Sequence, residues 1–74
     1  MTMNINHLNI KQAMTLASSQ PGTSGIFYRP STMDAVITPH GQEPQGFILW
    51  CDCSVASRMV EAYGLELAYQ KVAC

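Results

Sequence analysis

The sequence predicts a small α+β domain with the element order α-β-β-β-α-β, a four-stranded, mostly antiparallel sheet, and two helices packed on one face of it. The first observation behind this prediction is the unbroken apolar run 47–51, which is short and rich in residues that favour strands. The second is a helical period that begins at Val55 and ends at Gly64. The third is a pair of short strand-like segments before the run, separated by a turn.

A first helix is predicted after Asn9. The Asn9 side chain can accept a hydrogen bond from the first helical turn, and Gln12 stands three residues later in the capping-box position. Leu8 can pack against Ala13 as a hydrophobic staple. The Pro-Gly pair 21–22 ends this helix. Its apolar stripe consists of Ile10, Ala13, Met14 and Ala17, with Leu16 at its edge.

The next segments predict an antiparallel hairpin followed by a long loop. Residues 26–29 are aromatic and β-branched, and residues 33–38 alternate between two faces, so both are predicted strands. Residues 30–32 form the turn between them, where proline pre-sets a backbone angle. The polar stretch 39–45 contains two prolines and one glycine, which predicts the loop to the next strand.

The run 47–51 is predicted to be the central strand of the sheet. Because side chains alternate along a strand, Phe47, Leu49 and Cys51 are expected on one face. Ile48 and Trp50 are expected on the other. A strand that is apolar on both faces is typical of a position covered on both sides.

The C-terminal third predicts a helix and a closing strand. Ser54 is a suitable N-cap for the helix, and Gly64 can take the left-handed conformation that ends it. Residues 65–70 then alternate, which favours a strand whose direction relative to its neighbours is open. The competing interpretation is one helix over 55–72, in which the internal glycine would cost about 1 kcal/mol.

Length and composition indicate one domain over 1–74 that has a partner, with residues 1–6 expected to be flexible. Hydrophobic residues make up 47% of the chain and charged residues 12%, about half the charged share of a typical soluble protein. The net charge is −1, so repulsion does little to keep copies apart. We therefore expect a second copy or another protein as the partner.

The same composition argues against several other classes. The four cations, Lys11, Arg29, Arg58 and Lys71, are scattered, so general nucleic-acid binding is not expected. The sequence shows no run long enough for a transmembrane helix and no signal-peptide pattern. The odd count of three cysteines favours reduced thiols and a cytoplasmic location.

If both helices cover one face of the sheet, the opposite face is apolar and becomes a candidate interface. The sequence leaves open whether one or both faces are covered. The residues expected on it are Ile48, Trp50, Val36, Phe27 and Ala68. We predict a non-enzymatic protein-interaction module, an adaptor or stoichiometric inhibitor, that acts through this face and the 39–45 loop with His40. We expect it to form a homodimer and to need no cofactor.

Two alternative predictions give the chain a chemical function. A thiol at a helix N-terminus can have a lowered pKa, so Cys53 with Cys51 as resolving partner could form a thiol-dependent enzyme or a redox sensor. The two cysteines have one residue between them instead of the usual two, and a packing role for both is the simpler interpretation. Scattered ligands could also form a metal-binding module, but their spacing along the sequence does not match that of zinc sites. These ligands are Cys51, Cys53, Cys74, His40 and His7.

A general base is the remaining catalytic hypothesis. His40 could serve as one if a carboxylate such as Glu43 or Asp34 orients its ring. No serine in a nucleophile-elbow context accompanies it. A solvated loop histidine is the simpler interpretation, and we predict no enzymatic activity.

Overall fold

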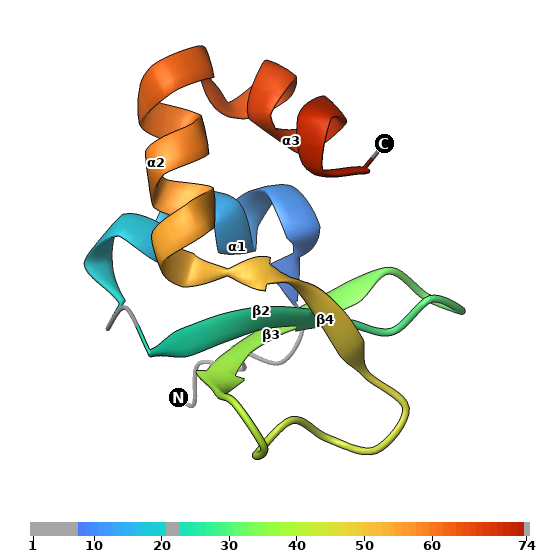
Figure 1. Ribbon diagram of the computed structural model, residues 1–74. Coiled ribbons are helices and arrows are strands. Elements are labelled where there is room, and N and C mark those ends of the chain that lie inside the picture. Colours follow the sequence, from blue (N-terminus) through green and yellow to red (C-terminus); the bar gives the residue numbers. More distant parts are fainter. Residues whose placement is uncertain (1–7, 21–22, 74) are drawn as a thin grey trace, which may run out of the picture.

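The computed structural model describes residues 8–20 and 23–73 and confirms a small α+β domain. The predicted flexibility of residues 1–6 and the predicted stop at 21–22 fall outside the described residues. The helices lie together on one side of a twisted sheet (Figure 1). The elements in chain order are β1 (Leu8–Asn9), α1 (Ile10–Leu16), the 3-10 turn η2 (Ala17–Ser19), β2 (Ser24–Tyr28), β3 (Asp34–Pro39), β4 (Ile48–Asp52), α2 (Cys53–Tyr63) and α3 (Leu65–Ala73).

The sheet has the order β1-β3-β2-β4, and its neighbouring strands are antiparallel. Three strands of five or six residues form its body, and the two-residue β1 adds only to the outer side of β3. The predicted set of four strands is wrong, because residues 65–70 lie in α3. The predicted central position of the run 47–51 is also wrong, since β4 is an edge strand.

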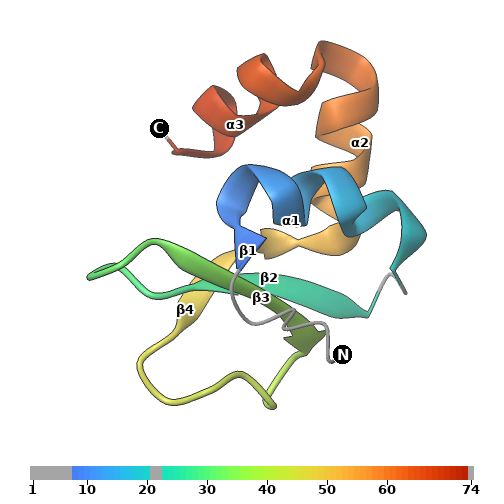
Figure 2. The same ribbon diagram turned by 180° about the vertical axis from the view of Figure 1, so that it is seen from behind.

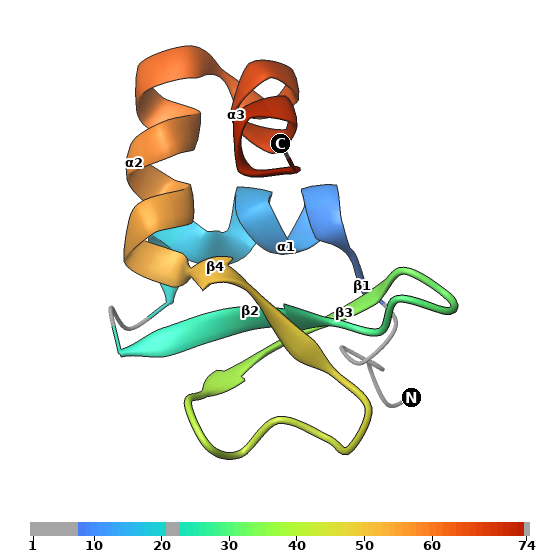
Figure 3. The ribbon, with the colours of Figure 1, turned by 45° about the vertical axis from the view of Figure 1, so that its right-hand side comes forward.

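The sequence also predicts that the strands 26–29, 33–38 and 47–51 are neighbours in chain order, as a meander, and this is wrong as well. The connection from β3 to β4 shapes the molecule. β3 and β4 are each antiparallel to β2 and flank it, so they run parallel to each other. β3 ends opposite the start of β2, whereas β4 starts opposite its end. The chain must therefore return along the whole length of β2. Residues 40–47 make this return across the sheet face that points away from the helices (Figures 1 and 3).

A bulge in β4 changes which side chains share a face. Ile26 pairs with Cys51 and the next residue, Phe27, pairs with Leu49, so Trp50 is the extra residue. The predicted alternation therefore holds from Phe47 to Trp50 and fails at Cys51. Trp50 and Cys51 both pack against the helix-side core, and Leu49 lies across from Phe27 on the other face.

The main core lies between the helices and the sheet. Its buried members are Ile10, Ala13, Met14, Ala17, Ile26, Ala35, Cys53, Ala56 and Ala68. They include the four residues of the predicted stripe of the first helix, which are confirmed, whereas Leu16 at the edge of this stripe is 43% exposed. The other face of the sheet has its own small cluster, Phe27, Val36 and Phe47, so both faces are covered.

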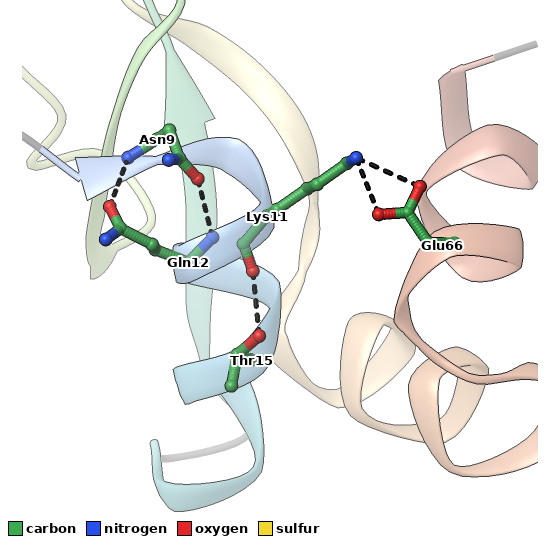
Figure 4. A network of polar contacts seen from close by, with 5 residues as sticks. All are labelled: Asn9, Lys11, Gln12, Thr15 and Glu66. Atoms are coloured by element: carbon green, nitrogen blue, oxygen red, sulfur yellow. Dashed lines mark hydrogen bonds and ion pairs between the residues drawn. The ribbon is translucent and has the colours of Figure 1, made fainter.

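The start of α1 confirms the predicted capping box. The Gln12 backbone N–H donates to Asn9 Oδ1 at 2.8 Å, and the Asn9 backbone N–H donates to Gln12 Oε1 at 3.0 Å (Figure 4). Seen from behind, β1 leads straight into α1, and α3 lies above α1 (Figure 2). Lys11 Nζ joins these two helices through Glu66, at 3.0 and 2.8 Å from its two carboxylate oxygens (Figure 4).

Gly64 separates α2 from α3. It has φ +83°, and α2 ends at Tyr63 as predicted. The N-cap of α2 is Asp52 instead of the predicted Ser54, and its side chain makes no capping hydrogen bond. The predicted strand over 65–70 and the single helix over 55–72 are both wrong.

The composition and spacing of α3 explain why it is a helix. Leucine, glutamate, alanine, glutamine and lysine are strong helix formers. Its core-facing residues, Leu65, Ala68, Tyr69 and Val72, recur at helical spacing. Leu67, which the strand pattern required on the same side as Leu65, is 45% exposed. Among the described residues no helix is long and apolar enough to cross a membrane.

Candidate functional site

The structure does not gather the predicted interface residues on one face. Ile48 pairs with Tyr28, and Trp50 packs on the helix side of the sheet. Phe27 and Val36 are buried on the opposite side. Ala68 belongs to α3 and is fully buried in the helical core. A candidate interaction surface therefore lies where apolar side chains are exposed in the folded chain.

Trp50 is an internal anchor between the sheet and α3. Its ring stacks on Tyr69 with centroids 5.5 Å apart and meets Tyr28 edge-on at 5.4 Å. Its indole N–H is buried and donates to no atom of the described residues. Such geometry is typical of aromatic packing, and Trp50 holds the C-terminal helix to the sheet.

The loop 40–47 is fixed to the sheet by aromatic and polar contacts. Phe47 is buried beside Phe27, and the Arg29 guanidinium lies 4.9 Å from the Phe47 ring centroid. His40 meets Phe27 edge-on at 5.6 Å, and its Nε2 is 2.7 Å from Asp52 Oδ1. The Asp52–His40 pair joins the loop to the end of β4, so the loop covers this face of the sheet.

Gly25 makes room for the His40 ring. A Cβ at this position would lie 3.2 Å from His40 Cε1 and 3.1 Å from Phe27 Cε1. Both distances are tighter than ordinary contacts, so a side chain here would push the histidine away. The close approach explains why the smallest residue fits in this buried strand.

Two neighbouring apolar side chains are exposed at the start of β4, whereas the other large ones exposed among the described residues, Leu16, Met33, Tyr63 and Leu67, lie on other elements. Ile48 is 48% exposed and Leu49 is 49% exposed. The strand pairing places Ile48 with Tyr28 and Leu49 with Phe27, so the two side chains stand on opposite faces of the sheet. No other strand of the described residues pairs with the outer side of β4. We call Ile48, Leu49 and this open strand edge the β4 edge.

The two thiols beside the β4 edge do not have the electrostatics of reactive cysteines. Burial, with smaller contributions from Cys53 and Asp52, raises the pKa of Cys51 to about 11. Burial and then Asp52 also raise the pKa of Cys53. Both thiols therefore stay protonated near neutral pH, whereas a thiol nucleophile needs a lowered pKa. Both cysteines are free.

The described residues hold no metal-site geometry, whereas the ring of His40 does have a carboxylate beside it. Within 8–20 and 23–73, no group of three or more His, Cys, Asp and Glu side chains could hold a metal ion. Two proposed ligands, His7 and Cys74, lie outside these ranges. His40 contacts Asp52 instead of the predicted Glu43 or Asp34, and Glu43 accepts from the Gly41 backbone N–H at 3.0 Å.

A shallow hollow of about 230 Å³ lies between α1, α3 and the β2–β3 turn. Its lining residues are Asn9, Ile10, Lys11, Met33 and Tyr69. The Lys11 ammonium is already paired with Glu66 and lies 5.1 Å from the Tyr69 ring centroid. The hollow is smaller than the roughly 300–1,000 Å³ usual for small-molecule sites.

Comparisons of the chain with protein-family models, with curated proteins and with solved structures found no match. The geometry of the β4 edge therefore supplies the functional argument.

Proposed function

We propose that the chain is a non-enzymatic protein-interaction module, an adaptor or a stoichiometric inhibitor, which binds a protein partner at the β4 edge. The observation that carries this proposal is the pair Ile48 and Leu49, half exposed on the two faces of an edge strand. A strand added at this edge would take up unpaired backbone N–H and C=O groups. The two side chains would then contribute apolar contacts above and below the new strand.

Neighbouring residues suit this role. The 39–45 loop leads to the β4 edge and supplies polar groups beside it, and Arg29 lies over Phe47 at its start. Apolar anchors with a polar rim are the usual anatomy of a protein interface. β4 carries neither lysine nor proline, which many edge strands use to prevent pairing. We also propose a cytoplasmic location, supported by the free thiols of Cys51 and Cys53.

Affinity capture with matched variants tests this function. The tagged chain is used to capture proteins from the cells that express it, and Ile48→Lys is compared with Leu67→Lys. Both changes place a lysine at a half-exposed apolar position, but Leu67 lies on α3, away from β4. We expect Ile48→Lys to lose at least ten-fold of the bound partner, which corresponds to about 1.4 kcal/mol. Equal capture by the two variants would refute binding at the β4 edge.

A further inference from the structure

This inference rests on the proposed function and concerns which partner binds at the β4 edge. The sequence and geometry of β4 indicate that partner. We infer that β4 pairs with β4 of a second copy in antiparallel fashion, about a two-fold axis that lies between the two strands level with Ile48, called here the axis through Ile48. The two sheets then join into one continuous sheet. Ile48 of each copy lies against Ile48 of the other, and Phe47 lies against the other copy's Leu49.

Symmetry restricts the register of such a pair. An antiparallel two-fold axis is perpendicular to the sheet, so the helix sides of both copies lie on the same side. Paired side chains must share a face, so the axis lies level with a residue and not level with the peptide bond between two residues. Phe47 and Leu49 both belong to the loop side, and Ile48 belongs to the helix side. An axis through Ile48 therefore places apolar residues opposite apolar residues on both faces.

The bulge selects this axis over the neighbouring one. An axis through Leu49 would bring Ile48 opposite Trp50, the extra residue at the bulge. A bulge twists a strand edge and interrupts its pairing. With the axis through Ile48, the contacts from Phe47 to Leu49 are complete before the bulge begins.

Charge along the edge is complementary under the same symmetry. Residues 46–51 carry no charge, so no like charges oppose each other near the axis. Asp52 lies at one end of β4, and the Arg29 guanidinium lies over Phe47 at the other. Antiparallel pairing directs Asp52 of each copy toward the Arg29 end of its partner. A parallel arrangement would place like ends together.

The size of the contact indicates a weak dimer. Only a short strand segment and two half-exposed apolar side chains meet, whereas a stable complex buries roughly 1,200 Å² or more. We therefore expect a monomer–dimer equilibrium that depends on concentration and is populated at tens of micromolar and above.

A charge-swap experiment tests both the partner and the register. Sedimentation velocity is measured for the wild type, for Ile48→Lys, for Ile48→Glu, for the equimolar mixture of these two variants, and for Leu67→Lys. We expect the wild type and Leu67→Lys to dimerise and each Ile48 variant alone to be monomeric. The mixture should regain the dimer, because only this register places residue 48 opposite residue 48. Circular dichroism checks that every variant is folded.

Two results would overturn the inference. A wild type that stays monomeric at hundreds of micromolar, or a mixture that stays monomeric while the wild type dimerises, excludes this self-pairing. The proposed function is judged separately by the capture experiment. If Ile48→Lys abolishes capture of a protein from cells while the wild type is a monomer, the β4 edge binds another protein and the second copy is wrong.

Discussion

The two faces of the sheet are covered in different ways. On one face three helices and η2 bury nine residues, most of them alanine or small aliphatic side chains. On the other face the loop 40–47 covers only Phe27 and Val36, with Phe47 contributed by the loop itself. The first cover is made of regular elements that depend on one another. The second is one irregular segment fixed by a few side-chain contacts.

This difference indicates two levels of stability in one small molecule. Removing an atom from the helix-side core affects all the elements that meet there, so we expect it to weaken the whole fold. Loosening the loop exposes one face of the sheet but leaves the helical layer in place, so we expect local opening. The same loop leads to the β4 edge, where the proposed binding occurs.

The largest expected effect is that of Ile26→Ala on the helix side. Ile26 is fully buried between the sheet and the helices. The change should lower the free energy of unfolding by about 2–5 kcal/mol. A core this small rarely supplies more than about 3–5 kcal/mol, so the variant should be largely unfolded in urea titrations. The control Leu67→Ala removes an exposed side chain and should change little. Equal effects of the two variants would contradict the description of this core.

Phe47→Ala is the matching change on the loop side. Phe47 is 8% exposed and fills the space between the loop and Phe27. We expect a loss below the roughly 3–5 kcal/mol of Phe→Ala in a rigid core, because the loop can move into the space. Hydrogen exchange should show faster exchange in 40–47 and unchanged protection in α1. Loss of protection in α1 would show that the two faces do not open independently.

The cover of these two faces was only partly predictable from the sequence, because some of the interactions join neighbouring residues and others join distant segments. The capping box at Asn9 and the stop at Gly64 depend on residues a few positions away, and the sequence predicts both correctly. The sheet order depends on which strand β4 pairs with, and no local pattern encodes that choice. The loop 40–47 is long enough to cross a sheet face. Its length was the one feature of the sequence that indicated such a crossing.

The wrong strand over 65–70 and the divided interface have other causes. Residues 65–70 fit both an alternating and a helical pattern, and helix propensity, which favours Leu, Glu, Ala and Gln, decided the outcome. The bulge leaves Trp50 opposite to Leu49, as predicted, and turns Cys51 to the same side as Trp50, so an assignment based on alternation fails beyond the bulge. Ile48 stayed exposed, as expected, but its predicted neighbours Val36 and Phe27 are buried.

A smaller effect is expected from His40→Ala, which removes the polar link between the loop and Asp52. Both side chains are nearly half exposed, so the pair should contribute only about 0.2–1 kcal/mol. We expect faster hydrogen exchange in the loop without a measurable change in the urea midpoint. Gln42→Ala, an exposed change in the same loop, is the matched control. If both variants exchange alike, the contact of His40 with Asp52 does not hold the loop.

The smallest expected effect is a dependence of stability on pH that comes from the helix side alone. Cys51 and Cys53 pack on that side, and the loop-side cluster contains no cysteine. The pKa of Cys51 is about 11 in the folded chain against 9.0 for a free thiol. Between these values the unfolded chain has lost the proton that the folded chain keeps. The unfolded state then binds fewer protons, so stability falls as pH rises from about 9 to about 11 and is unaffected below.

The comparison of wild type with Cys51→Ala isolates this contribution, because the two proteins differ only at this thiol. Cys51 is only half buried, so solvent reduces the effect below what the pKa difference alone would imply. We expect the thermal midpoint of Cys51→Ala to fall less steeply between pH 9 and pH 11 than that of the wild type. The His40→Ala variant should keep the wild-type slope, since its change lies on the loop side. Identical slopes for wild type and Cys51→Ala would mean that this thiol is hydrated in the folded chain and that the helix-covered face is less tightly closed at β4 than its contacts indicate.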